Sequence, residues 1–249
     1  MKNTNSILQS YDSITLREMD KVKLMDRMDT KFTFSFDNLA LILQKVKPFY
    51  KVLNINETLI SRYQTLYYDT ADLYLYNRHH AGQLNRYKVR HRTYVESNLG
   101  FLEVKFKNNK GRTLKQRINK MEAQNTWDGD SEEFLKLKTP FDPKTLVPIL
   151  WINYNRLTLV NKINAERLTI DLNLEFKKDG KDQVFHNLVI AEVKQEGKYP
   201  SPFLQIMKEM HIREGSISKY CMGVALSIPN VKFNNFKSTL LTLKKIINI

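Results

Sequence analysis

A period-two alternation of charged and other residues is the feature of this chain that most constrains its fold. In the stretch NRYKVRHRTY, residues 85–94, cations occupy every second position: Arg86, Lys88, Arg90 and Arg92. Successive side chains of a β-strand point to opposite faces, so a strand here presents four cations on one face. Because like charges at this spacing repel one another, such a face needs either solvent or an anion beside it.

The same division into two faces recurs along the chain. An apolar face and a face mixing Lys or Arg with Asp or Glu are found in segments 27–36, 101–107, 166–176 and 188–196. The charged faces carry Arg27, Asp29 and Lys31; Glu103, Lys105 and Lys107; Arg167, Asp171 and Glu175; and Glu192, Lys194 and Glu196. About eight such strands with few βαβ alternations predict an α+β fold. We expect an eight-stranded antiparallel β-barrel with helices packed outside.

The pattern leaves two orientations of the strands open. In the first, the apolar faces form the core and the charged faces meet solvent, as in an antiparallel sheet with one wet side. In the second, amphipathic helices such as 39–46 and 201–210 cover the apolar faces from outside. The charged faces would then line the interior of the barrel, and a highly charged partner would be required there.

The net charge narrows the classes of partner. The 249 residues include 40 Lys and Arg against 26 Asp and Glu, a formal net charge of +14. Such a balance favours polyanions: nucleic acid, phosphate chains or anionic membrane surfaces. A nucleic-acid-binding protein carries its basic residues on an outer surface with exposed aromatic residues. Here the cations are confined to one face of each strand, so we expect no nucleic acid partner.

Other features bear on the compartment and on domain organisation. The single cysteine, Cys221, excludes an internal disulfide and a cysteine-based zinc site and suits a reducing compartment. The N-terminus does not read as a secretory signal, and no run of 18 apolar residues predicts a transmembrane helix. We expect one domain over 1–249 in the cytoplasm, with the membrane face as an option. The amphipathic helix expected at about 231–249 would pack on its own domain, the alternative being a membrane or a membrane-protein partner.

Seven short blocks in order resemble the VTC domain (vacuolar transporter chaperone, polyphosphate polymerase). They are RMDTKF, YKVRHRTY, LEVKFK, YNR, LTIDLNL, AEVKQ and SKYC, and they extend from about residue 15 to 227. The family's usual first block is Arg-x-Glu-x-Lys-Phe/Tyr, so Asp29 is one methylene shorter than the family residue. The wider group is the triphosphate tunnel metalloenzymes, or CYTH-like proteins. The resemblance implies an eight-stranded tunnel whose cations point inward.

The resemblance also implies a set of site residues. Phosphate would be held by Lys31, Arg90, Arg92, Lys105, Arg156 and Lys219, with further substrate contacts from Arg27, Lys88, Lys107, Lys115, Arg117 and Lys194. The implied metal is Mn²⁺ or Mg²⁺, with Glu192 as the best ligand and Glu103, Asp171 and Asp29 as weaker candidates. Arginine suits phosphate because its planar fork donates two hydrogen bonds at fixed geometry.

The implied reaction transfers the γ-phosphate of ATP to a growing inorganic polyphosphate chain and releases ADP. Two alternatives stay open: a tripolyphosphate or nucleoside-triphosphate phosphatase, in which water is the acceptor, and a non-catalytic polyphosphate-binding module. Single residues also have simpler explanations. Arg156 could be a surface cation, Glu192 could pair with Lys194, and Lys219 could be solvated at a helix start.

Two aromatic features are interpreted from the residues alone. His79 and His80 are read as loop residues and not as metal ligands. The tyrosine-rich stretch 63–76 is read as packing over the barrel wall, with stacking on a nucleotide base as the alternative.

Overall fold

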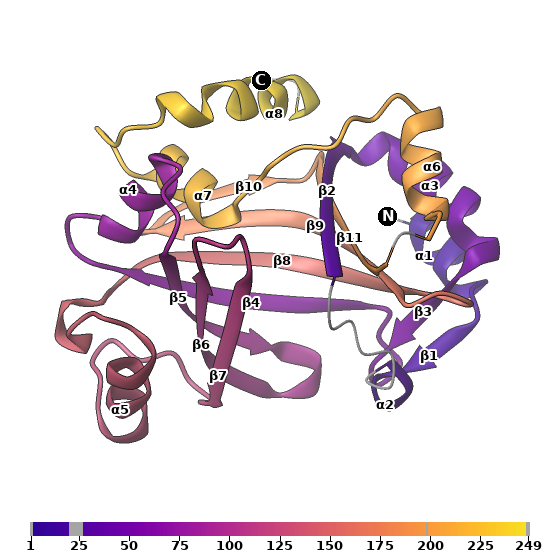
Figure 1. The fold of residues 1–249 in the computed structure, drawn as a ribbon. Coiled ribbons are helices and arrows are strands. Elements are labelled where there is room, and N and C mark those ends of the chain that lie inside the picture. The colour runs from indigo at the N-terminus through magenta and orange to yellow at the C-terminus, as the bar shows by residue number, and fades with distance from the viewer. Residues whose placement is uncertain (1, 20–26, 198, 248–249) are drawn as a thin grey trace.

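The computed structural model describes residues 2–19, 27–197 and 199–247, which form an 11-stranded sheet with helices packed against it (Figure 1). The strands are β1 Ser13–Thr15, β2 Arg27–Ser35, β3 Tyr50–Asn54, β4 Ile60–Asp69, β5 Arg86–Tyr94, β6 Leu99–Lys107, β7 Thr113–Asn119, β8 Val147–Asn161, β9 Glu166–Lys178, β10 Lys181–Phe185 and β11 Leu188–Glu196. The helices are α1 Lys2–Gln9, α2 Leu16–Met19, α3 Leu39–Val46, α4 Tyr74–His80, α5 Gly129–Lys138, α6 Pro202–Glu209, α7 Lys219–Ser227 and α8 Lys237–Ile247.

Eight of the strands follow one hydrogen-bonded path, in the order β2-β11-β9-β8-β4-β5-β6-β7, and every pairing along it is antiparallel. The sheet curls so that β2 and the β6–β7 hairpin both run across the direction of the long strands β8 and β9 (Figure 1). Over the described residues no pairing joins β2 to β7, so the path stays open there. The predicted α+β fold with an eight-stranded tunnel-like sheet is confirmed.

Three short strands lie off this path. β10 forms a hairpin with β9 through Asp179 and Gly180, whose φ angles of 50° and 75° suit the Asp-Gly turn. The Asp-Gly pair is a typical hairpin signal, and the strand that follows it is β10, which precedes β11 in the chain. β3 pairs with β8, and β1 pairs with β3 in the parallel sense.

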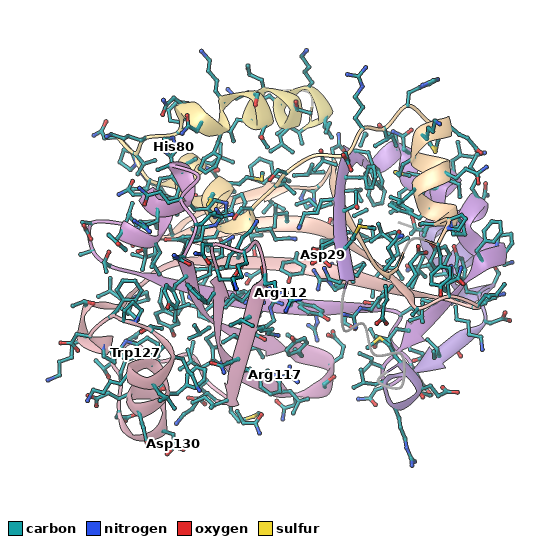
Figure 2. All side chains as sticks on the ribbon, viewed as in Figure 1. Asp29, His80, Arg112, Arg117, Trp127 and Asp130 are labelled. Carbon is teal, nitrogen blue, oxygen red and sulfur yellow. The ribbon has the colours of Figure 1, made fainter. Side chains whose placement is uncertain are left out.

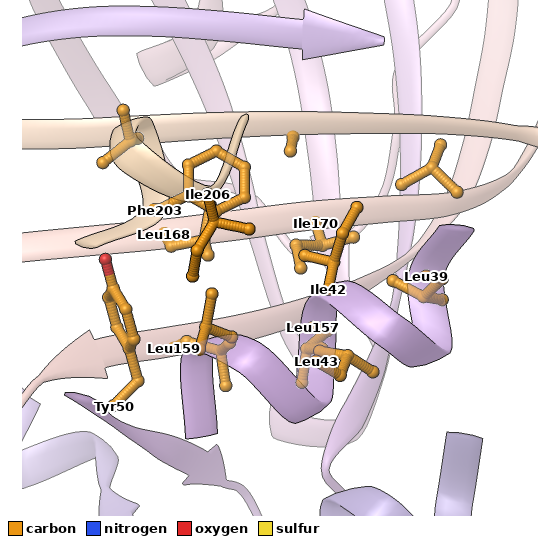
Figure 3. Close-up of a cluster of buried hydrophobic side chains, with 14 of the residues drawn as sticks. Leu39, Ile42, Leu43, Tyr50, Leu157, Leu159, Leu168, Ile170, Phe203 and Ile206 are labelled. Carbon is orange, nitrogen blue, oxygen red and sulfur yellow. The ribbon is translucent and has the colours of Figure 1, made fainter. Parts of the chain in front are cut away.

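The apolar faces of the strands point outward and are covered by helices, which decides between the two orientations. Leu39, Ile42 and Leu43 of α3 lie in one buried cluster with side chains of β8, β9 and α6 (Figure 3). Leu168 and Ile170 of β9 belong to this cluster, while Asp171 of the same strand takes part in the charged contacts described below. The charged faces therefore line the inner side of the curled sheet.

A second apolar cluster joins α7 and α8 to β8 and β9. α7 approaches the sheet closely at Gly223, where an added Cβ atom would lie 2.3 Å from a methyl group of Leu150 and 2.9 Å from the Phe176 ring. Leu243 anchors α8 in the same cluster, so the C-terminal helix packs on its own domain. α8 begins at Lys237 rather than at residue 231, and residues 248–249 lie outside the described ranges.

The structure corrects the interpretation of the adjacent histidines. His79 and His80 are the last residues of α4 and not part of a loop. His80 is buried and accepts a hydrogen bond from the backbone N–H of Asn235, which joins α4 to the segment before α8. Of the helices in the described ranges, none has the length and apolar character needed to cross a bilayer.

Candidate functional site

The inner face of β5 and β6 is organised around Glu103, which is fully buried. Its Oε2 contacts the Arg90 guanidinium at 2.7 Å through Nε and 2.6 Å through Nη2, and its Oε1 contacts Lys115 of β7. Burial alone would raise the pKa of Glu103, but Arg90, Arg92 and Lys115 hold it well below its usual range. Arg90 also donates to the Tyr67 hydroxyl at 3.0 Å. Glu103 therefore fixes the orientation of a buried arginine.

Next to Glu103 lies a row of three lysines on neighbouring strands. The register places Lys88 of β5 opposite Lys105 of β6, and Lys105 opposite Lys115 of β7. The positive charge of Arg90, followed by burial, lowers the pKa of Lys105 well below its usual value, and burial lowers that of Lys88. Lys88 donates to the Ser218 hydroxyl at 3.1 Å. Lys115 has the Glu103 carboxylate beside it, whereas the charged forms of Lys88 and Lys105 would be stabilised by an added anion.

Lys88, Arg92 and Lys105 are inner-face cations without a carboxylate partner in the ranges that the structure describes. Arg86, Lys107 and Arg117, nearer the ends of β5, β6 and β7, share this property. Arg92 is buried, and its Nε donates only to the Thr65 hydroxyl, at 3.2 Å. We call Lys88, Arg92 and Lys105 the cation-only wall.

On the strands opposite, Asp171 orients two further cations. Its carboxylate accepts two hydrogen bonds from Arg156, at 2.6 Å from Nε and 2.8 Å from Nη2, and it also contacts the Lys219 ammonium. The register explains the first contact, because Arg156 of β8 pairs with Asp171 of β9. Burial would raise the pKa of Asp171, but Arg156 and Lys219 lower it to about 2. Arg156, Asp171 and Lys219 form the paired wall, so neither cation is the surface residue that the sequence left open.

Tyrosine rings support the arginines of both walls. The Arg156 guanidinium carbon lies 4.9 Å from the ring centre of Tyr63 and 5.2 Å from that of Tyr154. Arg92 lies 5.6 Å and 5.9 Å from the same two rings, which stack on each other. The sequence interpretation missed this role, although Tyr63 and Tyr154 alternate with polar residues on strands predicted to line the barrel.

A third group of charges joins β2 to β11. Glu192 contacts Lys31 at 3.1 Å and Lys194 at 2.5 Å, and Lys194 also contacts Asp29 at 3.0 Å. The carboxylates of Glu192 and Asp29 thus converge on the ammonium group of Lys194, which occupies a position where a small cation could bind. Mn²⁺ and Mg²⁺ bind hard oxygen ligands and need only one or two carboxylates when phosphate oxygens complete the shell. Glu192 and Asp29 therefore fit such a metal, because the two carboxylates share one ammonium group. Glu103 and Asp171 also contact two cations each, but in the described ranges neither shares a cation with a second carboxylate.

The remaining predicted site residues lie around these groups. Within the described ranges no three Asp, Glu, His or Cys side chains come together as a metal cluster, so the four predicted metal ligands are not one site. Lys107 pairs in register with Arg86 at one end of the row. The guanidinium carbon of Arg117 lies 4.1 Å from the Phe101 ring centre. Arg117 is on β7 and Asp29 is on β2, the two edge strands of the path (Figure 2). The side chain of Arg27 lies outside the described part of the chain.

The fold and these side chains define a class of protein: a curled antiparallel sheet whose inner face is lined by cations. The sequence profile of the VTC domain matches residues 26–228, so the chain belongs to the VTC domain family. Family and fold together make it a polyphosphate- or triphosphate-related tunnel protein.

A solved structure supports the fold. A protein from Bacillus halodurans described as a "putative adenylate cyclase" is 15% identical, with a TM-score of 0.51, and the match covers 78% of this chain and 96% of that chain. A Hippeastrum protein, named as an adenylyl cyclase candidate with a dominant triphosphatase activity, is 14% identical with a TM-score of 0.49, covering 80% and 96% of the two chains. No curated protein sequence gives a significant match.

Proposed function

We propose that this protein is an ATP-dependent polyphosphate polymerase. A terminal oxygen of the polyphosphate chain forms a new bond to the γ-phosphorus of ATP. The bond from that phosphorus to the β–γ bridging oxygen breaks, and ADP leaves with the electron pair. Phosphoryl transfer of this kind needs in-line positioning and neutralisation of charge more than covalent help from the protein.

The observation that carries the proposal is the cation-only wall. Lys88 and Lys105 lie opposite each other on neighbouring strands, and Arg92 lies on the same inner face, without a carboxylate on any of the three. A chain of phosphates brings one or more negative charges for each cation, spaced along a line as the lysine row is. Simple burial of these side chains for packing would not favour three like charges on one inner face.

The walls have different roles in the proposed reaction. Arg156 and Lys219 are held in place by Asp171 before any ligand binds, and Arg90 is held in the same way by Glu103. These pre-oriented donors suit the transferring phosphoryl group, where a fixed geometry lowers the barrier. Lys88, Arg92 and Lys105 would bind the neighbouring phosphates of the chain.

Glu192 and Asp29 are the residues that would hold a divalent metal, with Lys31 beside them to contact a phosphate oxygen. A bound Mn²⁺ or Mg²⁺ would supply neutralisation of charge on the phosphates. Lys194, which now contacts both carboxylates, would turn toward phosphate in that arrangement.

The test is incubation of the purified protein with ATP and Mn²⁺, with products resolved on a gel that detects phosphate chains. The wild type should make long chains and ADP in matching amounts, and Glu192→Gln should make neither. Lys144→Met, at an exposed position away from the tunnel, is the matched charge control and should behave as wild type.

The same gel separates the alternatives. Free phosphate without chains would replace the polymerase by a phosphatase that uses the same cations with water as acceptor. Tight binding of polyphosphate with no product would indicate a binding module and would contradict an enzymatic role.

A further inference from the structure

The fully buried carboxylate of Asp69, at the end of β4, lies outside the groups described above. Its Oδ1 accepts hydrogen bonds from the backbone N–H groups of Thr70 at 2.8 Å and Leu75 at 2.7 Å. Its Oδ2 accepts from the backbone N–H of Tyr76 at 2.8 Å and from the Tyr220 hydroxyl at 2.6 Å. Asp69 thus joins β4, the start of α4 and the first turn of α7 through one buried group.

The first turn of α7 reaches three different strands with three consecutive residues. The Ser218 hydroxyl accepts from Lys88 of β5, the Lys219 ammonium contacts Asp171 of β9, and Tyr220 donates to Asp69 of β4. Two of these contacts hold members of the two walls. The third contact, between Tyr220 and Asp69, is buried, and both side chains are almost completely shielded from solvent.

A second connection runs from Tyr220 to Arg90. The Tyr220 ring stacks on the Tyr67 ring, with centres 4.9 Å apart and an angle of 16° between the planes. The Tyr67 hydroxyl accepts a hydrogen bond from Arg90 at 3.0 Å. A change in the position of Tyr220 would therefore displace both Lys219, its neighbour in the chain, and Arg90, which is hydrogen-bonded to Tyr67.

We propose that Asp69 and Tyr220 are positioning residues that fix the start of α7 so that Ser218 and Lys219 meet the phosphate chain. The hydrogen bond is suited to this task because burial, followed by the Asp69 charge, raises the pKa of Tyr220 well above its usual value, which keeps the hydroxyl protonated as a donor. The ligand class, a linear phosphate chain, rests on the proposed function. The anchoring of α7 itself rests only on the contacts above.

The test compares Tyr220→Phe in the wild-type and Lys219→Met backgrounds, with inorganic tripolyphosphate as the probe in isothermal titration calorimetry. Losing a hydrogen bond to a buried carboxylate should displace Lys219, so Tyr220→Phe should weaken binding about tenfold in the wild-type background. In the Lys219→Met background the same change should weaken binding less than about twofold, because the residue being positioned is already gone.

Tyr76→Phe is the matched control. Its hydroxyl donates to the Lys232 carbonyl at 2.6 Å, and its ring packs edge-on against Tyr220, yet the hydroxyl does not touch Asp69. It should leave tripolyphosphate affinity unchanged. Equal losses from Tyr220→Phe in both backgrounds, or equal losses from Tyr220→Phe and Tyr76→Phe, would overturn the positioning role.

Amide hydrogen exchange separates this inference from the proposed function. Tyr220→Phe, or Asp69→Asn as a second variant, should accelerate exchange in the first turn of α7 about tenfold without ligand, while Tyr76→Phe should not. A wild-type protein that binds no tripolyphosphate would overturn the proposed ligand, and positioning would then be judged by exchange alone. Unchanged exchange at α7 in both variants would overturn the inference.

Discussion

The cation-only wall and the paired wall face the same interior but differ in how their positive charges are compensated. Arg156 and Lys219 share the carboxylate of Asp171, so their charges are compensated in the protein itself. Lys88 and Lys105 face each other without an acidic partner, and their pKa values are lowered. The difference indicates that one wall is oriented before the ligand arrives, whereas the other is stabilised by the ligand's own charge.

The largest effect should come from breaking the paired wall. Asp171→Asn leaves the half-buried Arg156 and Lys219 without their counter-charge, and we expect a loss of about 3 kcal/mol in the free energy of unfolding. Urea denaturation measures it. Asp12→Asn is the control, because Asp12 pairs with Lys162 at 2.7 Å on the exposed surface, where solvent screens the pair and the loss should be far smaller. Equal losses in the two variants would mean that the wall is not a buried network.

In the cation-only wall, removing a charged side chain should raise the unfolding free energy and not lower it. Lys105→Met removes a repelling charge, so we expect the unliganded protein to gain about 1 kcal/mol in unfolding free energy. The same change should weaken tripolyphosphate binding about tenfold, because one charge-assisted contact to phosphate is lost.

Lys115→Met sharpens this comparison, since Lys115 lies in the same row but contacts Glu103. It should lower the unfolding free energy by about 1 kcal/mol, because a buried carboxylate loses one of its partners. If Lys115→Met raised the unfolding free energy, or Lys105→Met lowered it, the presence of a carboxylate partner would not explain whether loss of a lysine stabilises or destabilises the protein.

The walls also explain which parts of the molecule could be predicted from sequence. Period-two patterns gave the long strands and their two faces, because alternation follows directly from strand geometry. The pair Ser201-Pro202 is typical of a helix start, and the Ser201 hydroxyl accepts a hydrogen bond from the backbone N–H of Leu204 in α6. Such features depend on residues close together in the chain, and they are visible without knowledge of the fold.

Features that depend on the pairing of distant strands could not be predicted. Glu103 and Asp171 looked like metal ligands, because nothing local shows that Arg90 or Arg156 lies on the neighbouring strand. The helical state of His79 and His80 was missed because the aromatic residues before them have no clear helical period. The contact between Asp69 and Tyr220 joins residues 151 positions apart, so it appears only when α7 is placed against β4.

The pH dependence of stability provides a finer test of the cation-only wall. The pKa of Lys105 is lowered in the folded protein from its usual 10.5, so between these two values the unfolded chain binds more protons than the folded one. Unfolding free energy should therefore rise with pH across this window, while tripolyphosphate affinity falls because the bound form needs the ammonium. Lys105→Met should reduce the pH dependence of both the unfolding free energy and the tripolyphosphate affinity, each by the equivalent of no more than about one proton bound or released. If the pH dependence in Lys105→Met were identical to that of the wild type, a group other than Lys105 would be the one that titrates.

The smallest predicted effect tests the link between the two walls. The Tyr63 ring lies beside Arg92 of the cation-only wall and Arg156 of the paired wall, so it holds the two guanidinium groups at a fixed separation. Tyr63→Leu removes both contacts. Because each contact also exists without ligand, we expect only about 0.5–1 kcal/mol of their sum to be lost from binding, a two- to fivefold weakening of tripolyphosphate affinity. Tyr63→Phe keeps the ring and should bind as wild type does. If Tyr63→Leu also bound as wild type, each wall would hold its arginine independently, and the ligand alone would bring the two together.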